Sequence, residues 1–150
     1  MIHRVIAHKT RQTFERVNRH DYASILQDVR PDVYHRFAGD HALGGERRDK
    51  EHMRLWFERL GRVIPGLTLS VTDIWIKGGL LKAVVIARWT AQATLLDGTT
   101  YRNHGVHIIH LRNLKVASFD VNEDSQAVAR ALARQAKAGL EEARAAPITS

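Results

Sequence analysis

The chain contains no cysteine among its 150 residues. This absence excludes a disulfide framework, a thiolate zinc site and a cysteine nucleophile. No apolar run is longer than a few residues, so no segment is expected to span a membrane. The first residues, "MIHRVIAHKTRQTF", also lack the continuous apolar core of a secretory signal. We therefore expect a cytoplasmic protein that does not contact membranes.

The chain also has little that is typical of nucleic-acid binding, although its net charge is +7. Most of its 23 basic residues are arginines that are spread along the whole sequence, with acidic residues beside them. No aromatic-interleaved basic stripe, zinc finger or RNP-type motif is present. The basic residues are interpreted as a solvated surface, and no specific nucleic-acid partner is expected.

What is present is the composition of an ordinary globular domain, with 44% hydrophobic and 26% charged residues. A chain of this length can bury a core without covalent staples. At its end, "ARAAPITS", alanines lead into Pro147 and a polar tail. The sequence therefore predicts a single domain over residues 1–144 and a flexible tail over residues 145–150.

The first half of the sequence has mostly helical periodicity. Asp21 and Asp49 each precede a helical pattern and are expected to be N-caps. Proline ends two of these helices, at Pro31 and Pro65. The predicted elements are helices at 2–17, 22–29 and 50–64, a strand at 32–39 and a loop at 40–48.

From residue 67 the hydrophobic period changes to two, which predicts four strands separated by Gly-Gly, Asp-Gly and Asn-Leu turns. An alanine-rich helix capped by Asp124 or Ser125 follows. This order predicts an α+β fold in which the N-terminal and middle helices wrap one face of a curved, five-stranded, antiparallel or mixed sheet. Such a cone leaves a cavity between helices and sheet. The predicted elements are strands at 67–78, 80–96, 100–112 and 115–121, and a helix at 124–145.

The segment "NHGVHIIH", residues 103–110, has three histidines at intervals of three. In a strand, His107 points to the face opposite that of His104 and His110. The latter two share a face but lie roughly 20 Å apart at the rise of a strand. The three imidazoles cannot bind one ion, so no metal site is expected here.

The first hairpin is predicted from Asp97-Gly98, which is typical of a two-residue type I′ turn. This turn would place Arg88 opposite His107. Polar side chains on the same face would extend the row, and these are Thr90, Gln92 and Asn103.

The second hairpin is less well defined by the sequence. A two-residue turn at Asn113-Leu114 would bring Asp120 opposite His107. Leucine is poorly suited to a positive φ, so a longer loop or a bulge would shift the register by one residue. In the simple register, Arg88, His107 and Asp120 form a cross-strand row. This row is either a proton shuttle near neutral pH or a set of paired polar groups on an exposed face, and the sequence leaves both open.

Taken in order, several segments resemble the nuclear transport factor 2-like superfamily, in its SnoaL-like polyketide cyclase branch. Ketosteroid isomerase and limonene epoxide hydrolase are similar at a greater distance. The resemblance covers roughly residues 5–132 and rests on "NRHDYASIL", "RPDVYHRFAG", "GGERRDKEHMRLWFERL", "ARWTAQATLLDGTTYRNHGVHIIHL" and "VNEDSQAVARAL". It implies a small-molecule pocket on the concave sheet face and a homodimer through the convex face. Trp75 and Trp89, on the convex face or in the core, are candidates for that interface.

The resemblance also assigns positions to individual residues. His107 falls where the isomerase has a pocket carboxylic acid, and Arg88 falls where the hydrolase has a pocket arginine. However, Thr90 stands where the hydrolase needs an acid, and Arg36 stands where the isomerase has its general base. Because neither relative has its full catalytic set here, the resemblance implies neither of those two activities.

Two strands and one helix remain open to two interpretations. The resemblance points Tyr34 and Arg36 toward the pocket, whereas an ordinary edge strand with an exposed arginine fits these residues equally well. The resemblance also implies that Val121, rather than Asp120, faces the cavity. Trp56 is interpreted either as a core residue or as a platform for the ligand.

We therefore expect a protein that binds a small, partly apolar organic molecule without a cofactor. If it is an enzyme, it is an isomerase, cyclase or hydratase that uses acid/base chemistry; the alternative is a non-catalytic ligand-binding or protein-interaction domain. His107 would transfer the proton, with Arg88 and Asp120 as its catalytic partners. The predicted substrate-binding residues are Tyr34, Arg36, Asn103, Thr90, Gln92 and Trp56.

Overall fold

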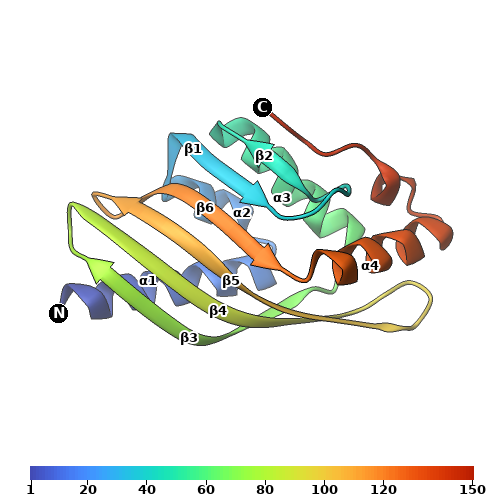
Figure 1. Cartoon of the computed structure of the whole chain (residues 1–150), viewed down its shortest axis with the longest axis horizontal. Coiled ribbons are helices and arrows are strands. Elements are labelled where there is room, and N and C mark those ends of the chain that lie inside the picture. Colours follow the sequence, from blue (N-terminus) through green and yellow to red (C-terminus); the bar gives the residue numbers. More distant parts are fainter.

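The computed structural model describes residues 1–150 and consists of one sheet covered on one face by helices (Figure 1). The six strands have the order β2-β1-β6-β5-β4-β3. Strand β1 runs parallel to β6, and the other neighbouring strands are antiparallel. The predicted α+β fold with a mixed sheet is therefore confirmed. The helices are α1 (Ile2–Asn18), α2 (Tyr22–Gln27), α3 (Lys50–Val63), α4 (Ser125–Lys137) and the 3₁₀ helix η1 (Glu141–Arg144). The strands are β1 (Val29–Phe37), β2 (Gly45–Arg47), β3 (Thr68–Gly78), β4 (Lys82–Thr94), β5 (Thr100–Arg112) and β6 (Lys115–Glu123).

Three helices begin at the aspartates that the sequence marks as N-caps. The side chain of Asp21 accepts a hydrogen bond from the backbone N–H of Ser24 at 3.3 Å. Asp49 accepts from the N–H of His52 at 2.8 Å. Asp124, the first of the two alternatives for the last helix, accepts from two backbone N–H groups of the first turn. Each carboxylate pairs N–H groups that have no partner within their own helix.

Several predicted boundaries are wrong. Helix α2 ends at Gln27 and β1 begins at Val29, so Pro31 lies inside the strand and does not end the helix. The loop predicted at 40–48 contains the short strand β2, so the sheet has six strands rather than five. The helix predicted at 124–145 ends at Lys137, because Gly139 takes a φ of +112° that a helix cannot continue through. After this glycine the chain forms η1.

The β4–β5 hairpin does not have the predicted two-residue turn. Of the two central residues, only Gly98 has a positive φ, whereas a type I′ turn needs both. Leu95 instead donates to the carbonyl of Thr99 at 2.8 Å, and Gly98 donates to Leu95 at 2.9 Å. The loop therefore has three residues, which shifts the register of β4 against β5 by one.

The β5–β6 hairpin begins with the predicted two-residue turn, because Asn113 and Leu114 both have positive φ. The partly buried Leu114 packs against the core, which offsets the steric cost of this conformation. A bulge follows, since His110 pairs with Ser118 but Leu111 pairs with Val116. The extra residue, Ala117, produces the one-residue shift that the sequence left open.

The sheet has an inner face, which the helices cover, and an outer face. Along β4 the odd-numbered residues are buried and the even-numbered ones are exposed or half-buried. The side chain of Asn18 fixes α1 to the sheet, as it donates to the carbonyl of Leu69 at 2.9 Å and accepts from the N–H of that residue at 2.8 Å. Helix α4 closes one end of the cone. None of the helices combines the length and the apolarity needed to cross a membrane.

Residues 145–150 run beside β2. The carbonyls of Ala146 and Ile148 accept hydrogen bonds from Arg59 and Arg47, and the hydroxyl of Ser150 accepts one from the N–H of Arg48. These contacts place the last residues against the sheet edge. The domain boundary at 144 and the flexibility of this tail stay predictions.

Candidate functional site

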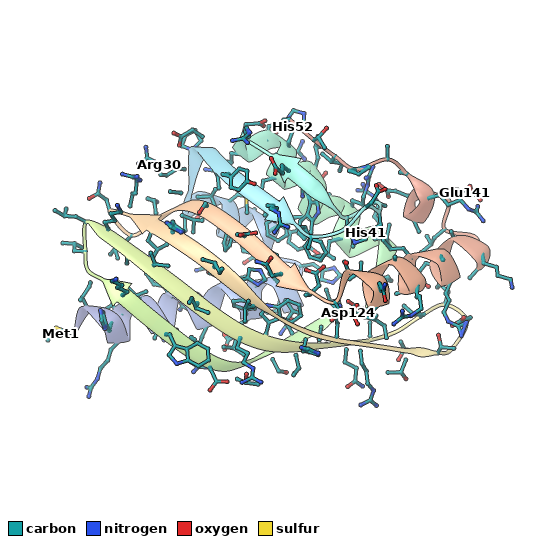
Figure 2. The ribbon with its side chains drawn as sticks, viewed as in Figure 1. Met1, Arg30, His41, His52, Asp124 and Glu141 are labelled. Atoms are coloured by element: carbon teal, nitrogen blue, oxygen red, sulfur yellow. The ribbon has the colours of Figure 1, made fainter.

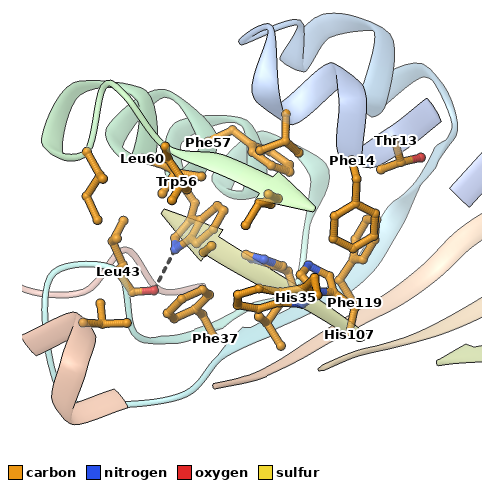
Figure 3. Close-up of a pocket in the computed structure, with 18 of the residues that line it drawn as sticks. Thr13, Phe14, His35, Phe37, Leu43, Trp56, Phe57, Leu60, His107 and Phe119 are labelled. Atoms are coloured by element: carbon orange, nitrogen blue, oxygen red, sulfur yellow. Dashed lines mark hydrogen bonds between the residues drawn. The ribbon is translucent and has the colours of Figure 1, made fainter. Parts of the chain in front are cut away.

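An apolar pocket lies between the helices and the inner face of the sheet (Figure 3). Of its 19 lining residues 16 are hydrophobic, and they come from α1, α3, α4, the loop before β2 and five of the six strands. The three remaining lining residues are polar, and they are Thr13, His35 and His107. The space inside the pocket that the centre of a water molecule can reach is about 60 Å³. The pocket is thus a narrow apolar space with few polar groups.

His107 lies in the pocket, as predicted, at the centre of the sheet on β5. Its neighbours in the sheet are Ala87 on β4 and Val121 on β6. The indole N–H of Trp89 donates to Nδ1 of His107 at 2.7 Å. Because indole can only donate, Nδ1 must be the unprotonated nitrogen, and the neutral imidazole carries its proton on Nε2. Nε2 makes no hydrogen bond to the protein, and the imidazole lines the pocket.

His35, on β1, has the same arrangement. The guanidinium Nη1 of Arg47 donates to Nδ1 of His35 at 3.0 Å. Arginine is also only a donor, so the neutral His35 carries its proton on Nε2, which makes no hydrogen bond to the protein. Both imidazoles lie beside Phe119, at centroid distances of 6.4 and 6.0 Å (Figure 3). The pocket thus receives two unpaired Nε2–H donors.

The surroundings keep both imidazoles neutral. Burial lowers the pKa of His107 to about 3, against a weaker opposing effect of Asp120. Burial, the charge of Arg47 and the proximity of His107 hold the pKa of His35 well below its usual range. Near neutral pH these side chains are therefore hydrogen-bond donors rather than acids. Such neutral imidazoles can stabilise negative charge that develops on a bound oxygen.

The predicted placement of Arg88 and Asp120 beside His107 is wrong. The three-residue loop pairs Arg88 with Val106, so its side chain lies on the outer face near Asp73, at 3.9 Å. The bulge in β6 likewise turns Asp120 outward. Val121 faces the pocket instead, as the family resemblance implies.

The predicted placement of Tyr34 and Arg36 in the pocket is also wrong, because β1 presents His35 and Phe37 to it. Nη1 of Arg36 pairs with Asp120 across the outer face at 2.7 Å. The ring of Tyr34 lies under the guanidinium of Arg48, 4.9 Å from its centroid. Both residues thus belong to the outer face.

The remaining predicted residues divide between the two faces. The register places Thr90 and Gln92 on the outer face, so their predicted pocket placement is wrong. Asn103 is buried on the inner face but lies outside the pocket lining. Its amide donates to the hydroxyl of Tyr101 at 2.9 Å, so it holds a neighbouring side chain of β5 rather than a ligand. Trp56 lines the pocket and donates to the carbonyl of Leu43 at 2.7 Å (Figure 3).

Trp89, a candidate for the dimer interface, is instead 4% exposed and lines the pocket. His104 and His110 lie on the outer face, because β5 alternates as predicted. No group of three or more His, Asp or Glu side chains is arranged to hold a metal ion.

Sequence reasoning missed His35 and Glu123. His35 lies between Tyr34 and Arg36, the two residues that the resemblance pointed toward the pocket. Assigning the opposite face of this strand to the pocket would have identified His35. Glu123 pairs with Gly105, and both of its carboxylate oxygens are buried without a hydrogen-bond partner. Burial raises the pKa of Glu123 to about 8. A Cβ at Gly105 would lie 2.9 Å from Cζ2 of Trp89 and 2.9 Å from Cβ of Glu123, so this glycine makes room for both.

His41 is a further residue without an assigned role, at the end of the sheet from which α4 leaves (Figure 2). Its Nδ1 accepts from the N–H of Leu43 at 3.2 Å, and its buried Nε2 has no partner. A Cβ at Gly39 would lie 2.4 Å from this nitrogen, so only a glycine at position 39 leaves room for the imidazole beside the backbone. His41 therefore helps to close the loop before β2.

The sheet and the helices on its inner face thus form an α+β cone around an apolar pocket. A sequence profile of the SnoaL-like domain family matches residues 10–119, and the chain belongs to this family.

Solved structures with the same nuclear transport factor 2-like fold include three informative examples. A protein of unknown function from Burkholderia pseudomallei has a TM-score of 0.71 at 20% identity, covering 83% of this chain and 95% of that one. TerC, co-crystallized with polyporic acid, has a TM-score of 0.66 at 23% identity, covering 77% and 88%. IdmH from Streptomyces antibioticus, a candidate polyketide cyclase, has a TM-score of 0.66 at 17% identity, covering 85% and 98%. No curated protein matches the sequence.

Proposed function

We propose that this chain binds a small, largely apolar, ring-containing molecule in the cone and holds one of its oxygens with the Nε2–H groups of His107 and His35. The observation that carries the proposal is the pair of unpartnered N–H donors in an otherwise apolar pocket. Apolar walls favour the ring, and a few fixed polar groups orient it. TerC, which was co-crystallized with polyporic acid, and IdmH, a candidate polyketide cyclase, support a ligand of this kind.

The chemistry that fits this site is cofactor-independent isomerisation, cyclisation or hydration. Where such a reaction begins with loss of a proton from the carbon next to a carbonyl group, negative charge develops on the carbonyl oxygen, and a water molecule takes up the proton because no protein base lines the pocket. Two preoriented N–H donors stabilise that charge because they need no reorganisation when it develops. In this proposal His107 is a catalytic hydrogen-bond donor rather than the proton-transfer group, since the pKa of its imidazole is too low for a base at neutral pH.

Ligand binding is tested by fluorescence titration, because Trp56 and Trp89 line the pocket and report on its contents. Polyporic acid and 2-naphthol are the first probes. His107→Asn keeps an oxygen to accept the N–H of Trp89 but removes the distal N–H. We expect this variant to bind the probes at least about tenfold more weakly, the loss of one hydrogen bond to a charged or polarised group.

The matched control is His110→Asn, on the exposed outer face of the same strand, which should bind as the wild type does. Equal affinity of His107→Asn and wild type would refute the role of His107. Absence of probe binding by the wild-type chain would remove the proposed function itself.

A second candidate is ligand binding without turnover. One observation favours it: the pocket lining contains no carboxylate, and both imidazoles are held neutral. Without a base, a bound ketone would not exchange its α-hydrogens. NMR of a bound cyclic ketone in D₂O distinguishes the two candidates, since accelerated exchange supports an enzyme and exchange at the uncatalysed rate supports a binding protein.

The proposal includes a homodimer through the outer face of the sheet. Trp75 on β3 is 51% exposed and pairs with Ile86 on β4, which is 36% exposed. Leu80 and Leu81 extend this apolar surface at the β3–β4 turn, with exposures of 56% and 73%. Exposed apolar side chains that lie together favour association.

A further inference from the structure

Arg47, at the end of β2, is a fully buried cation without a carboxylate partner. Its side chain is 0% exposed. Nε donates to the carbonyl of Ile148 at 3.0 Å, Nη2 to that of Gly44 at 2.8 Å, and Nη1 to Nδ1 of His35 at 3.0 Å. The guanidinium also lies over the ring of Trp56, 5.6 Å from its centroid. All of these partners are neutral.

A buried guanidinium is costly unless an anion compensates it. The charged groups that act on Arg47 do not compensate it. Glu46 is half-exposed and pairs with Arg48, and Arg59 on α3, which itself pairs with Glu142 at 3.2 Å, is another cation. Burial and Arg59 lower the pKa of Arg47 to about 10, so it still carries its charge at neutral pH. The protein thus leaves one positive charge uncompensated behind the pocket.

His35 connects this charge to the pocket. Arg47 donates to one nitrogen of the imidazole, and the other nitrogen presents its proton to the pocket space. A cation at Nδ1 withdraws electron density from the ring and strengthens the Nε2–H donor, because linked hydrogen bonds polarise one another. Direct contact with the ligand is not required for this effect.

We propose that Arg47, acting through His35, makes the pocket select the anionic form of its ligand, namely a phenolate or enolate oxygen conjugated to an apolar ring. This inference rests on the proposed function and names the ligand class that it takes. The Nε2–H groups of His35 and His107 donate to the oxyanion, and the buried charge of Arg47 balances it. Arg47 is a positioning and charge-compensating residue, since it lies behind His35.

The other titratable groups near the pocket are not expected to produce a preference for the anionic ligand. Burial raises the pKa of Tyr101 to about 12 and that of Glu123 to about 8, so both are largely neutral at neutral pH. Asp120 lies on the outer face, paired with Arg36. A charge preference of the ligand at neutral pH therefore reports on Arg47 and the two imidazoles.

The test uses the full chain with 4-nitrophenol and 4-nitroanisole. The first ionises near neutral pH, and its phenolate absorbs in the visible range; the second has the same ring but no ionisable proton. We expect the wild-type chain to bind the phenolate at least about tenfold more tightly than the phenol, which lowers the apparent pKa of the bound probe by at least about one unit. An unchanged or raised pKa of the bound probe would overturn the inference.

Arg47→Met should abolish the phenolate preference while nitroanisole binds as in the wild type. Arg48→Met is the matched control, because it removes the neighbouring arginine, which is 66% exposed, and should retain the preference. Retained preference in Arg47→Met would contradict the inference.

If Arg47→Met fails to bind nitroanisole, its fold has failed, and His35→Phe replaces it. This variant keeps the buried cation but removes its link to the pocket, and a phenolate preference that survives it would also contradict the inference. Failure of the wild type to bind either probe would remove the proposed function together with the inference. Binding of both probes without a charge preference would remove the inference alone.

Discussion

The protonation states of single residues follow from what surrounds them more than from their type. His107 and His110 are both imidazoles on β5, yet only His107 lies in an apolar pocket, with the indole N–H of Trp89 on one nitrogen. Glu123 shows the opposite case of a carboxyl group buried without a partner. For both, desolvation disfavours the charged form, which lowers the pKa of the imidazole and raises that of the carboxyl group.

Acid should destabilise the fold through His107. The folded-state pKa of about 3 lies below the usual value of 6.5, so the unfolded chain binds more protons between these values. The stability that neutral His107 contributes is fully present above about pH 6.5 and is lost as the pH falls toward 3. Urea unfolding over this range should show a shallower decline for His107→Asn than for the wild type. His110→Asn is the control, and a decline of His107→Asn that matches the wild type would count against a neutral, buried His107.

Base should destabilise the fold through Glu123. Its folded-state pKa of about 8 lies above the usual 4.5, so its contribution to stability is fully present below about pH 4.5 and is lost as the pH rises through about 8. Glu123→Gln should remove this dependence and be more stable than the wild type above about pH 8. The control is Glu15→Gln, on the exposed side of α1. The measurement is thermal unfolding from neutral to alkaline pH, and parallel curves for Glu123→Gln and wild type would refute the assignment.

At the scale of the elements, the sequence predicts the four α-helices, five of the six strands and the N-caps, because periodicity and capping are local properties. It does not predict which strand positions face each other. A turn longer by one residue moved Arg88 to the outer face, and one bulged residue did the same for Asp120. Since side chains alternate with a period of two, a slip of one residue exchanges the two faces. His107 stayed in the pocket because its own strand sets its direction, whereas its predicted partners depended on the register.

Gln135 shows how one side chain can join elements that the sequence leaves unconnected. It is 1% exposed; its Oε1 accepts from the N–H of Leu96 at 2.9 Å, and its Nε2 donates to the carbonyl of Val63 at 2.9 Å. This residue therefore ties α4 to the end of α3 and to the β4–β5 loop.

Gln135→Met should keep the volume but leave two backbone groups without partners. We expect a loss of free energy of unfolding on the order of 2 kcal/mol, the cost of unsatisfied buried polar groups. Gln126→Met, on the exposed side of the same helix, is the control and should change stability little. Urea unfolding measures both, and equal stabilities of the two variants would show that Gln135 is not a structural link.

At the scale of the whole molecule, the two faces of the sheet differ in what they present. Its inner face and the helices enclose the pocket, whereas its outer face presents paired charges and an apolar surface around Trp75. The sequence and its family resemblance predict this division, but they assign Trp89 to the wrong candidate role. Only the register shows that Trp89 belongs to the pocket.

The proposed dimer gives a prediction about the mass of the particle in solution. Trp75→Arg places a charge in the apolar outer surface and should convert a dimer to a monomer, because a desolvated charge without a partner opposes association. Gln92→Arg, at the other end of the same face, should remain dimeric. Light scattering after size-exclusion chromatography measures the mass, and a wild-type monomer or a dimeric Trp75→Arg would refute this interface.

The central claim is that two neutral imidazoles present Nε2–H donors to an apolar pocket. The most direct test is NMR of the chain labelled with ¹⁵N in its histidines, because the nitrogen shifts report the tautomer and the charge of each ring. The account predicts the Nε2–H tautomer for both His107 and His35, with the pKa of each ring below its usual range, and with both Nε2 shifts moving when nitrophenolate binds. An Nδ1–H tautomer, an imidazolium near pH 6, or Nε2 shifts that ignore the bound ligand would contradict it.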